Sequence, residues 1–218
     1  MTHPLPHAIT VHTPVTPPRR LVLLFHGVGA RPTDMVPLGQ GLVDVLGDAL
    51  IVSIQSPHPS GMGAGWEWFA VNGITEDNRV QRVAQAMPGF VATVRHWQQQ
   101  AQVDAAHTVL IGFSQGAIMV LEATQAQPGL AGQTFALAGR FAAAPQRSPA
   151  PTSVHLLHGD ADRVMPVAHA EAAFAQLGTL GAHVTLQRFE GLGHGIDPRV
   201  LAAVRQHMQT AQPGTDGH

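Results

Sequence analysis

The sequence predicts an α/β fold in which a mostly parallel central sheet carries helices on both faces. Short apolar runs typical of strands alternate with longer helical segments along the whole chain. One of these runs, Leu21 to Phe25, is continuously apolar, as in strands of parallel sheets that are buried on both faces. With 218 residues the chain is long enough for one sizeable core. We therefore expect residues 1–218 to form a single domain with frayed ends at 1–7 and 211–218.

Seven strands are expected in this sheet. Ala8 to Thr13 alternates between apolar and polar residues, as an edge strand does. The six later runs are more apolar, and loops or turns rich in glycine, proline or aspartate follow several of them. The predicted strands cover residues 8–13, 21–25, 49–55, 108–112, 135–138, 153–158 and 183–189.

Five helical segments lie between or after these strands. Within the second, Pro88 followed by Gly89 predicts a kink or a restart of the helix. The loop from Ser56 to Gly65 is too long for a simple connection, and loops of this length usually carry function. The predicted helices cover residues 34–46, 76–101, 117–125, 167–177 and 198–209.

The composition excludes several kinds of chemistry. All 12 basic residues are arginines, and the chain contains no cysteine. Schiff bases, serine–lysine dyads, cysteine nucleophiles and disulfides are therefore impossible. The formal net charge of −2 and the absence of a basic run predict neither nucleic acid nor a stable membrane association. Because residues 1–20 lack the apolar core of a signal peptide and no run could span a bilayer, we expect a cytoplasmic protein.

A nucleophile is predicted at Ser114. The motif G-x-S-x-G at residues 112–116 lies where a strand meets a helix. A sharp strand-to-helix turn strains the backbone of its corner residue, and only small residues fit beside that corner. The turn leaves the serine hydroxyl projecting. The motif is short, but this context favours a nucleophile elbow.

A base and an acid follow in the order that such a fold requires. A serine hydroxyl is almost fully protonated at neutral pH and needs a base. Among the histidines that follow the acidic loop, His194 stands in a glycine-rich loop after a strand, whereas the others lie in helices, at a strand start or at the end of the chain. The acidic loop after the strand 153–158 offers both Asp160 and Asp162. On spacing alone, either could accept a hydrogen bond from His194.

Two backbone N–H groups are expected to stabilise the oxyanion that forms during acyl transfer. Gln115 follows the nucleophile at a helix N-terminus, where the dipole favours negative charge. The second donor should come from the loop after an early strand, where Val28 is the best candidate. His26 in the same loop lies upstream of the expected base, and we interpret it as a structural hydrogen-bonding residue.

Four segments resemble the signatures of the phospholipase/carboxylesterase family of α/β-hydrolases, to which the acyl-protein thioesterases belong. They are Phe25 to Gly29, Gly112 to Gly116, His158 to Pro166, and Gly193 with His194. The segments 68–79 and 110–122 are similar to the bacterial esterases of this family. The resemblance covers about residues 8–209. Ala30 and Ala117 depart from many relatives, which have aspartate and glycine at these positions.

This resemblance implies the roles of the site residues. The family's triad corresponds to Ser114, Asp162 and His194, since its acid is the second aspartate of the His-Gly-Asp-x-Asp loop. Its oxyanion donors correspond to Val28 and Gln115. No metal or other cofactor is implied, and relatives often form homodimers.

Substrate preference is expected to depend on the long loop and on the residues after the acid. Apolar side chains from both could line an acyl groove, although Trp68 and Phe69 could equally belong to the core. The candidate pocket residues are Met62, Trp66, Trp68, Phe69, Val164 and Met165.

The expected function is that of a serine carboxylesterase acting on short- to medium-chain acyl esters through an acyl-enzyme. Two alternatives on the same scaffold are an acyl-protein thioesterase and a lysophospholipase. A non-catalytic binding protein of this fold is a third alternative, but such proteins typically lose a triad residue and none is lost here. A metal hydrolase is disfavoured because no H-E-x-x-H motif occurs.

Overall fold

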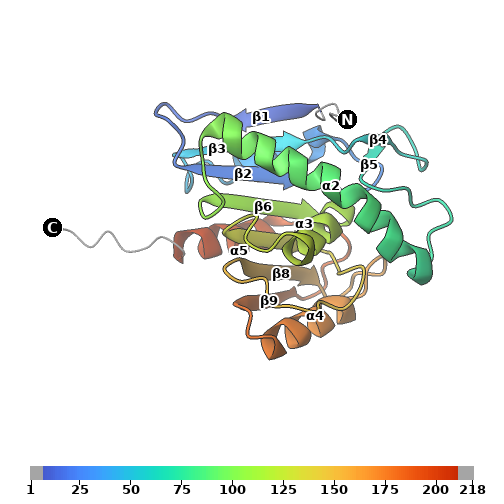
Figure 1. Ribbon diagram of the computed structural model, residues 1–218. Helices are drawn as coiled ribbons and strands as arrows, with labels where there is room; N and C mark the ends of the chain where they lie inside the picture. The colour runs from blue at the N-terminus through green and yellow to red at the C-terminus, as the bar shows by residue number, and fades with distance from the viewer. Residues whose placement is uncertain (1–6, 211–218) are drawn as a thin grey trace.

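A seven-stranded sheet forms the centre of the molecule in the computed structural model, which describes residues 7–210 (Figure 1). The strands lie in the order β1-β3-β2-β6-β7-β8-β9. Only β1 runs antiparallel to its neighbour, whereas the other pairs are parallel. The prediction of a mostly parallel α/β sheet is confirmed. The strands are β1 (Ala8–His12), β2 (Arg20–Phe25), β3 (Ala49–Ile54), β6 (Thr108–Phe113), β7 (Gln133–Leu137), β8 (Ser153–Gly159) and β9 (Val184–Phe189).

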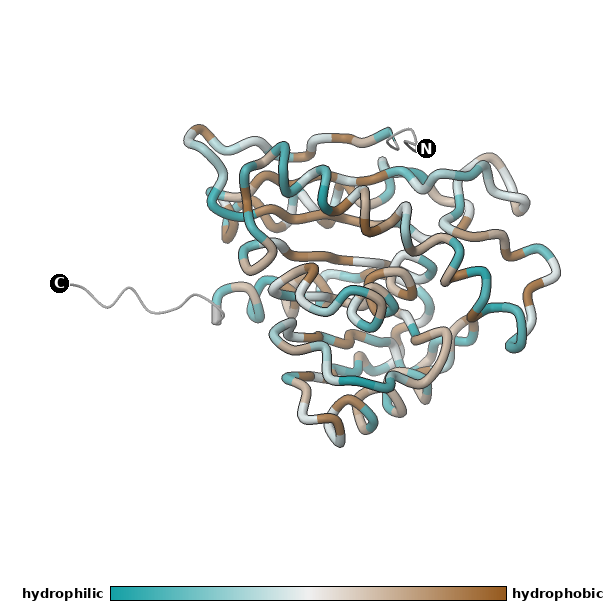
Figure 2. The backbone as a smooth tube through the Cα atoms, in the orientation of Figure 1, coloured by the Kyte–Doolittle hydropathy of each residue, from teal (hydrophilic) through white to brown (hydrophobic). Residues whose placement is uncertain are grey.

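Helices cover both faces of this sheet because side chains alternate across each strand. Leu21, Leu23 and Phe25 of β2 pack with α2 (Glu76–Ala101) and α3 (Gln115–Ala126). The intervening residues of β2 pack on the other face with α1 (Val36–Gln40) and α5 (Pro198–Thr210). Helix α4 (Ala168–Thr179) packs beside α3. Figure 2 shows hydrophobic residues gathered along the central strands and hydrophilic residues on the outer helical turns.

Two helical predictions differ from the structure. The helix expected over 34–46 is a 3-10 turn, η1 (Pro32–Met35), then the short α1 and a series of turns. Two glycines and a proline within residues 37–41 have low helix propensity, which explains the early end of α1. In α2, by contrast, Pro88 lies inside one continuous helix, so the predicted restart is absent. Apolar residues on both sides of Pro88, such as Val83 and Phe90, are buried in the core and hold the helix together.

The predicted frayed ends lie almost entirely outside the described residues. Residue 7 is the exception, because its carbonyl accepts a hydrogen bond from the N–H of Gln55 at 2.8 Å. Within residues 7–210, the helices lack the combination of length and apolar character that a membrane span requires.

Candidate active site

Ser114 lies at the corner between β6 and α3 in a backbone conformation that is rare for a residue with a side chain. Its φ of 53° and ψ of −114° store strain. Two glycines make the corner sterically possible. A Cβ added at Gly112 would lie 2.3 Å from the Gly116 carbonyl oxygen. A Cβ added at Gly116 would lie 2.2 Å from the Phe25 carbonyl oxygen. A larger residue at Gly112 would therefore displace the start of α3 from β6, and one at Gly116 would displace it from β2.

The loops after β8 and β9 bring an acid and a histidine to this corner. His194 Nε2 lies 2.8 Å from Ser114 Oγ, and His194 Nδ1 lies 2.7 Å from Asp162 Oδ2. A carboxylate accepts hydrogen bonds, so Nδ1–H donates to Asp162 and the unprotonated Nε2 can accept the Ser114 proton. The ring also packs against Phe113, with centroids 5.1 Å apart. This arrangement can deliver a deprotonated serine oxygen to a carbonyl carbon.

Asp162, and not Asp160, contacts the histidine. Its second oxygen, Oδ1, accepts hydrogen bonds from the N–H groups of Val164 and Met165 at 2.9 and 2.8 Å. Burial acts to raise the pKa of Asp162, but hydrogen bonds from Met165, His194 and Val164 outweigh it and lower the pKa below its usual value. Asp160 Oδ1 instead accepts from the N–H of Gly191 at 2.7 Å. Its carboxylate therefore supports the loop that carries His194.

A further buried histidine supports the acid. The side chain of His158 at the end of β8 is 1% exposed. Its Nε2–H donates to the Met165 carbonyl at 2.7 Å and lies 3.4 Å from Asp162 Oδ2. His158 thus ties the end of β8 to the turn that orients Asp162.

Two backbone N–H groups are available near Ser114 for a developing negative charge. Gln115 is the first residue of α3, so its N–H has no intrahelical acceptor. Val28, from the loop after β2, lines the same small cavity as Ser114 and Gln115. This loop approaches the serine closely, because a Cβ added at Gly27 would lie 3.1 Å from Ser114 Cβ.

His26 has a structural role in this loop. Its Nδ1–H donates to the Gly27 carbonyl at 2.7 Å, and its Nε2 accepts from the N–H of Ser56 at 3.1 Å. Burial is the main cause that lowers the pKa of His26, against the raising effect of the bond to Gly27. The neutral ring therefore joins the loop after β2 to the loop after β3.

The long loop after β3 is held against the site by hydrogen bonds that sequence patterns do not reveal. β4 (His58–Pro59) and β5 (Trp66–Glu67) pair with each other, and the N–H of Trp66 donates to the Ala30 carbonyl at 2.9 Å. The buried side chain of Gln115 accepts from the N–H of Trp68 at 2.8 Å and donates to the Phe69 carbonyl at 2.7 Å. Gln115 thus connects the nucleophile corner to the wall of the cavity.

Replacing Gln115 with alanine is expected to lower the free energy of unfolding by about 2 to 4 kcal/mol, because two buried backbone groups lose their partner. Gln125 is the matched control, since it lies on the same helix and also binds loop backbone, at Gln146 and Arg147, but near solvent. Water can replace that contact, so Gln125→Ala should cost less than about 1 kcal/mol. Urea denaturation measures both. Equal losses would contradict the role assigned to the Gln115 side chain.

The cavity beside Ser114 has a volume of about 170 Å³. It contains three of the six predicted pocket residues, namely Phe69, Val164 and Met165. Most of its wall is apolar, but it also carries arginine and histidine side chains. The other described residues that line it are Val28, Val71, Ile74, Arg79, Ser114, Gln115, Ile118, Arg140 and His169.

Met62, Trp66 and Trp68 do not line this cavity, which corrects their assignment to the substrate pocket. Met62 lies in the turn between β4 and β5 and is 69% exposed. Trp66 lies in β5, where its backbone pairs with Pro59 of β4 and with Ala30. Trp68 is 2% exposed in the core, and its Nε1–H donates to the His26 carbonyl at 2.9 Å. The adjacent Phe69 lines the cavity, and its carbonyl accepts a hydrogen bond from the Gln115 side chain at 2.7 Å.

The sequence interpretation missed Arg140 and His169. Arg140 follows β7, and the carboxyl ends of parallel strands meet at one edge of the sheet, where sites form. That position was a usable signal. His169 lies in α4, and only the packing of α4 brings it to the cavity.

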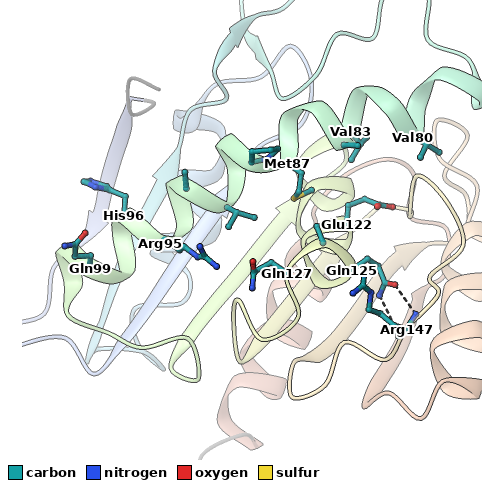
Figure 3. Close-up of a pocket in the computed structure, with 15 residues that line it drawn as sticks. Val80, Val83, Met87, Arg95, His96, Gln99, Glu122, Gln125, Gln127 and Arg147 are labelled. Carbon is teal, nitrogen blue, oxygen red and sulfur yellow. Dashed lines mark hydrogen bonds between the residues drawn. The ribbon is translucent and has the colours of Figure 1, made fainter. Parts of the chain in front are cut away.

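A larger cavity, of about 940 Å³, lies between α2 and α3 away from this site (Figure 3). Its described lining residues include Met87, Arg95 and Glu122 but none of Ser114, Asp162 and His194. This larger cavity is therefore separate from the candidate active site.

The family described as Phospholipase/Carboxylesterase matches residues 7–212. The chain is 48% identical over 203 residues to Esterase YpfH of Escherichia coli (strain K12). The aligned region covers 93% of this chain and 88% of that protein.

Solved structures with the same fold include esterases. The crystal structure of esterase PE8 superposes with a TM-score of 0.83 at 28% identity, covering 94% of this chain and 98% of that chain. The carboxylesterase of Bacillus cereus superposes with a TM-score of 0.79, covering 93% of each chain. Its identity is 17%, so this second likeness concerns the fold alone.

Proposed function

Since the chain belongs to the phospholipase/carboxylesterase family of α/β-hydrolases and is an esterase, we propose that it hydrolyses short- to medium-chain acyl esters with Ser114 as nucleophile. His194 acts as general base and Asp162 orients it. The observation that carries this proposal is the continuous hydrogen-bonded series from Asp162 through His194 to Ser114, with distances of 2.7 and 2.8 Å.

The proposed reaction has two halves. His194 Nε2 takes the Ser114 proton as Oγ attacks the ester carbonyl, and Asp162 stabilises the imidazolium that forms. The tetrahedral intermediate collapses when the bond to the alcohol breaks, and His194 gives its proton to the departing oxygen. Water then attacks the acyl-enzyme with His194 again as base, which releases the acid and restores Ser114.

The N–H groups of Val28 and Gln115 are the proposed oxyanion donors. Each such donor contributes about 3 to 4 kcal/mol of transition-state stabilisation in comparable enzymes. Both belong to the backbone, and their placement depends on the loop contacts of His26 and the Gln115 side chain. Substitutions that loosen these contacts should therefore lower kcat more than they raise KM.

The small cavity beside Ser114 supports short- to medium-chain acyl groups. Its volume of about 170 Å³ and its wall of Phe69, Ile118 and Met165 suit a short apolar chain. Acyl-protein thioesterase and lysophospholipase activities remain the alternatives on this scaffold, and both require room for a long chain.

A series of aryl esters and matching thioesters of increasing acyl length tests this proposal. We expect kcat/KM to be highest for short to medium acyl esters and to fall for long chains, because the cavity is small. A maximum at long-chain thioesters or at lysophospholipids would instead assign the chain to one of the two alternatives.

A further inference from the structure

Three basic side chains line the cavity beside Ser114. Arg79 comes from α2, Arg140 from the loop after β7 and His169 from α4. The two arginine side chains are only 16% and 17% exposed. Among the described residues that line the cavity, none is a carboxylate. Its charge is therefore positive although most of its wall is apolar.

One carboxylate is shared between the two arginines. Glu76 accepts a hydrogen bond from Arg140 Nη2 at 2.9 Å and also forms an ion pair with Arg79 Nη1. The Glu76 side chain is 67% exposed. The ion pairs with Arg79 and then with Arg140 lower the pKa of Glu76, so it is ionised. Two guanidinium charges against one carboxylate leave one positive charge without a partner at the cavity wall.

The donors of the two arginines are used differently. Arg140 donates from Nε to the Phe141 carbonyl, from Nη1 to Glu76 and His169, and from Nη2 to Glu76. Arg79 Nη1 is buried and forms an ion pair with Glu76 Oε1, although this contact lacks hydrogen-bond geometry. Within residues 7–210, Glu76 is the one side-chain partner of Arg79, and a guanidinium has five N–H donors, so Arg79 has donors left for a ligand.

A neighbouring arginine shows what a purely structural role looks like. Arg82, one turn later on α2, donates to the carbonyls of Ala70, Asn72 and Gly73 and thereby holds the preceding loop. Arg79 makes no such backbone contact among the described residues, and unlike Arg82 it lines the cavity beside Ser114. A largely buried guanidinium whose partner is one exposed carboxylate can still donate hydrogen bonds to a ligand.

The position of His194 indicates which part of the substrate enters this cavity. The departing alcohol must lie near His194 Nε2 to receive its proton. His194 is not among the described residues that line the cavity, whereas Ser114, Val28 and Gln115 are. The cavity therefore receives the acyl part, and Arg79 faces the acyl chain.

We propose that the site selects acyl groups that carry a carboxylate, as in monoesters of dicarboxylic acids, and that Arg79 binds this carboxylate with support from Arg140. The proposal rests on the proposed function of Ser114 as nucleophile. A guanidinium and a carboxylate can form two parallel hydrogen bonds, which adds geometric selectivity to the charge attraction.

Paired substrates test the proposal. Aryl monoesters of glutarate and adipate are compared with neutral esters in which an isopropyl group replaces the terminal carboxylate. A cavity that binds the acyl chain through apolar contacts alone would prefer the neutral ester. A preference for the ester with the carboxylate therefore requires a specific interaction with the charge. We expect kcat/KM to favour the carboxylate by about tenfold to hundredfold in the better-fitting pair, as for hydrogen bonds to charged groups.

Substitutions on α2 assign the preference to Arg79. Arg79→Gln should reduce the ratio of kcat/KM between the paired substrates by about tenfold or more, and Arg79→Lys should retain part of it. Arg95→Gln is the matched control, because Arg95 is exposed on the same helix away from Ser114. It should leave the ratio unchanged.

Equal kcat/KM values for both partners in the unmodified protein would overturn the inference, whether or not the variants fold. So would a ratio that Arg79→Gln leaves intact in a folded protein. If neutral esters are hydrolysed through Ser114 without preference for the carboxylate, the proposed function stands and only this inference fails. If no ester is hydrolysed through Ser114, the proposed function itself fails.

Discussion

Replacing Ser114 with alanine is expected to lower kcat/KM for aryl esters by about 10⁴-fold or more, because the acyl-enzyme can no longer form. The backbone N–H groups near the corner and the cavity remain, so we expect a slow residual turnover by direct attack of water. Steady-state kinetics with a short-chain aryl ester measures the loss. Circular dichroism checks that the variant is folded.

Ser60→Ala provides the control for this substitution. Ser60 lies in the long loop, where its hydroxyl accepts a hydrogen bond from the N–H of Met62. Its loss should change kcat/KM by less than about threefold, as for most surface substitutions. If Ser114→Ala in a folded protein keeps more than about a tenth of the activity, another residue is the nucleophile, since the loss of a triad serine is far larger.

Replacing Asp162 with asparagine is expected to lower kcat by about 10³- to 10⁴-fold. The asparagine amide can present N–H to His194, which favours the tautomer with the proton on Nε2. That tautomer cannot accept the Ser114 proton. Asparagine also lacks the negative charge that stabilises the imidazolium. Steady-state kinetics with a short-chain aryl ester measures the effect.

Asp160→Asn is the matched control for Asp162. Asp160 lies two residues earlier and, within residues 7–210, accepts one hydrogen bond, from the N–H of Gly191 at 2.7 Å and near solvent. An asparagine oxygen can accept the same hydrogen bond, so we expect a loss of less than about tenfold. Comparable losses in the two variants would contradict the assignment of Asp162 as the acid.

The sheet and the residues gathered around Ser114 could be predicted from local sequence. Apolar runs identify the strands, and in a parallel sheet the loops that follow them meet at one edge. That rule predicts that Ser114, the acidic loop and His194 lie close together before any contact is known. It does not distinguish Asp160 from Asp162. The distinction depends on the turn in which Asp162 Oδ1 accepts the N–H groups of Val164 and Met165.

The wall of the cavity could not be predicted in the same way. Trp68 and Phe69 are adjacent in sequence and both pack in the core, yet of the two only Phe69 also lines the cavity. Their directions depend on hydrogen bonds to Gln115, which is more than forty residues away in the chain. Such long-range contacts leave no periodic signal in the sequence.

The motif around Arg79 shows the same limit. Its match to the bacterial esterases of the family was visible in the sequence, but its meaning was not. Its partner Glu76 lies three residues earlier on the same helix. Its place beside Ser114, and the sharing of Glu76 with Arg140, emerge only when the chain folds.

Labelling with a fluorophosphonate probe tests the central claim, that Ser114 is the nucleophile, most directly. The probe forms a covalent bond with an activated serine, and mass spectrometry of the digested protein locates it. The account predicts one adduct per chain, on Ser114, with concurrent loss of esterase activity and no adduct in Ser114→Ala. Labelling of another residue that abolishes activity, or undiminished labelling of Ser114→Ala, would contradict it.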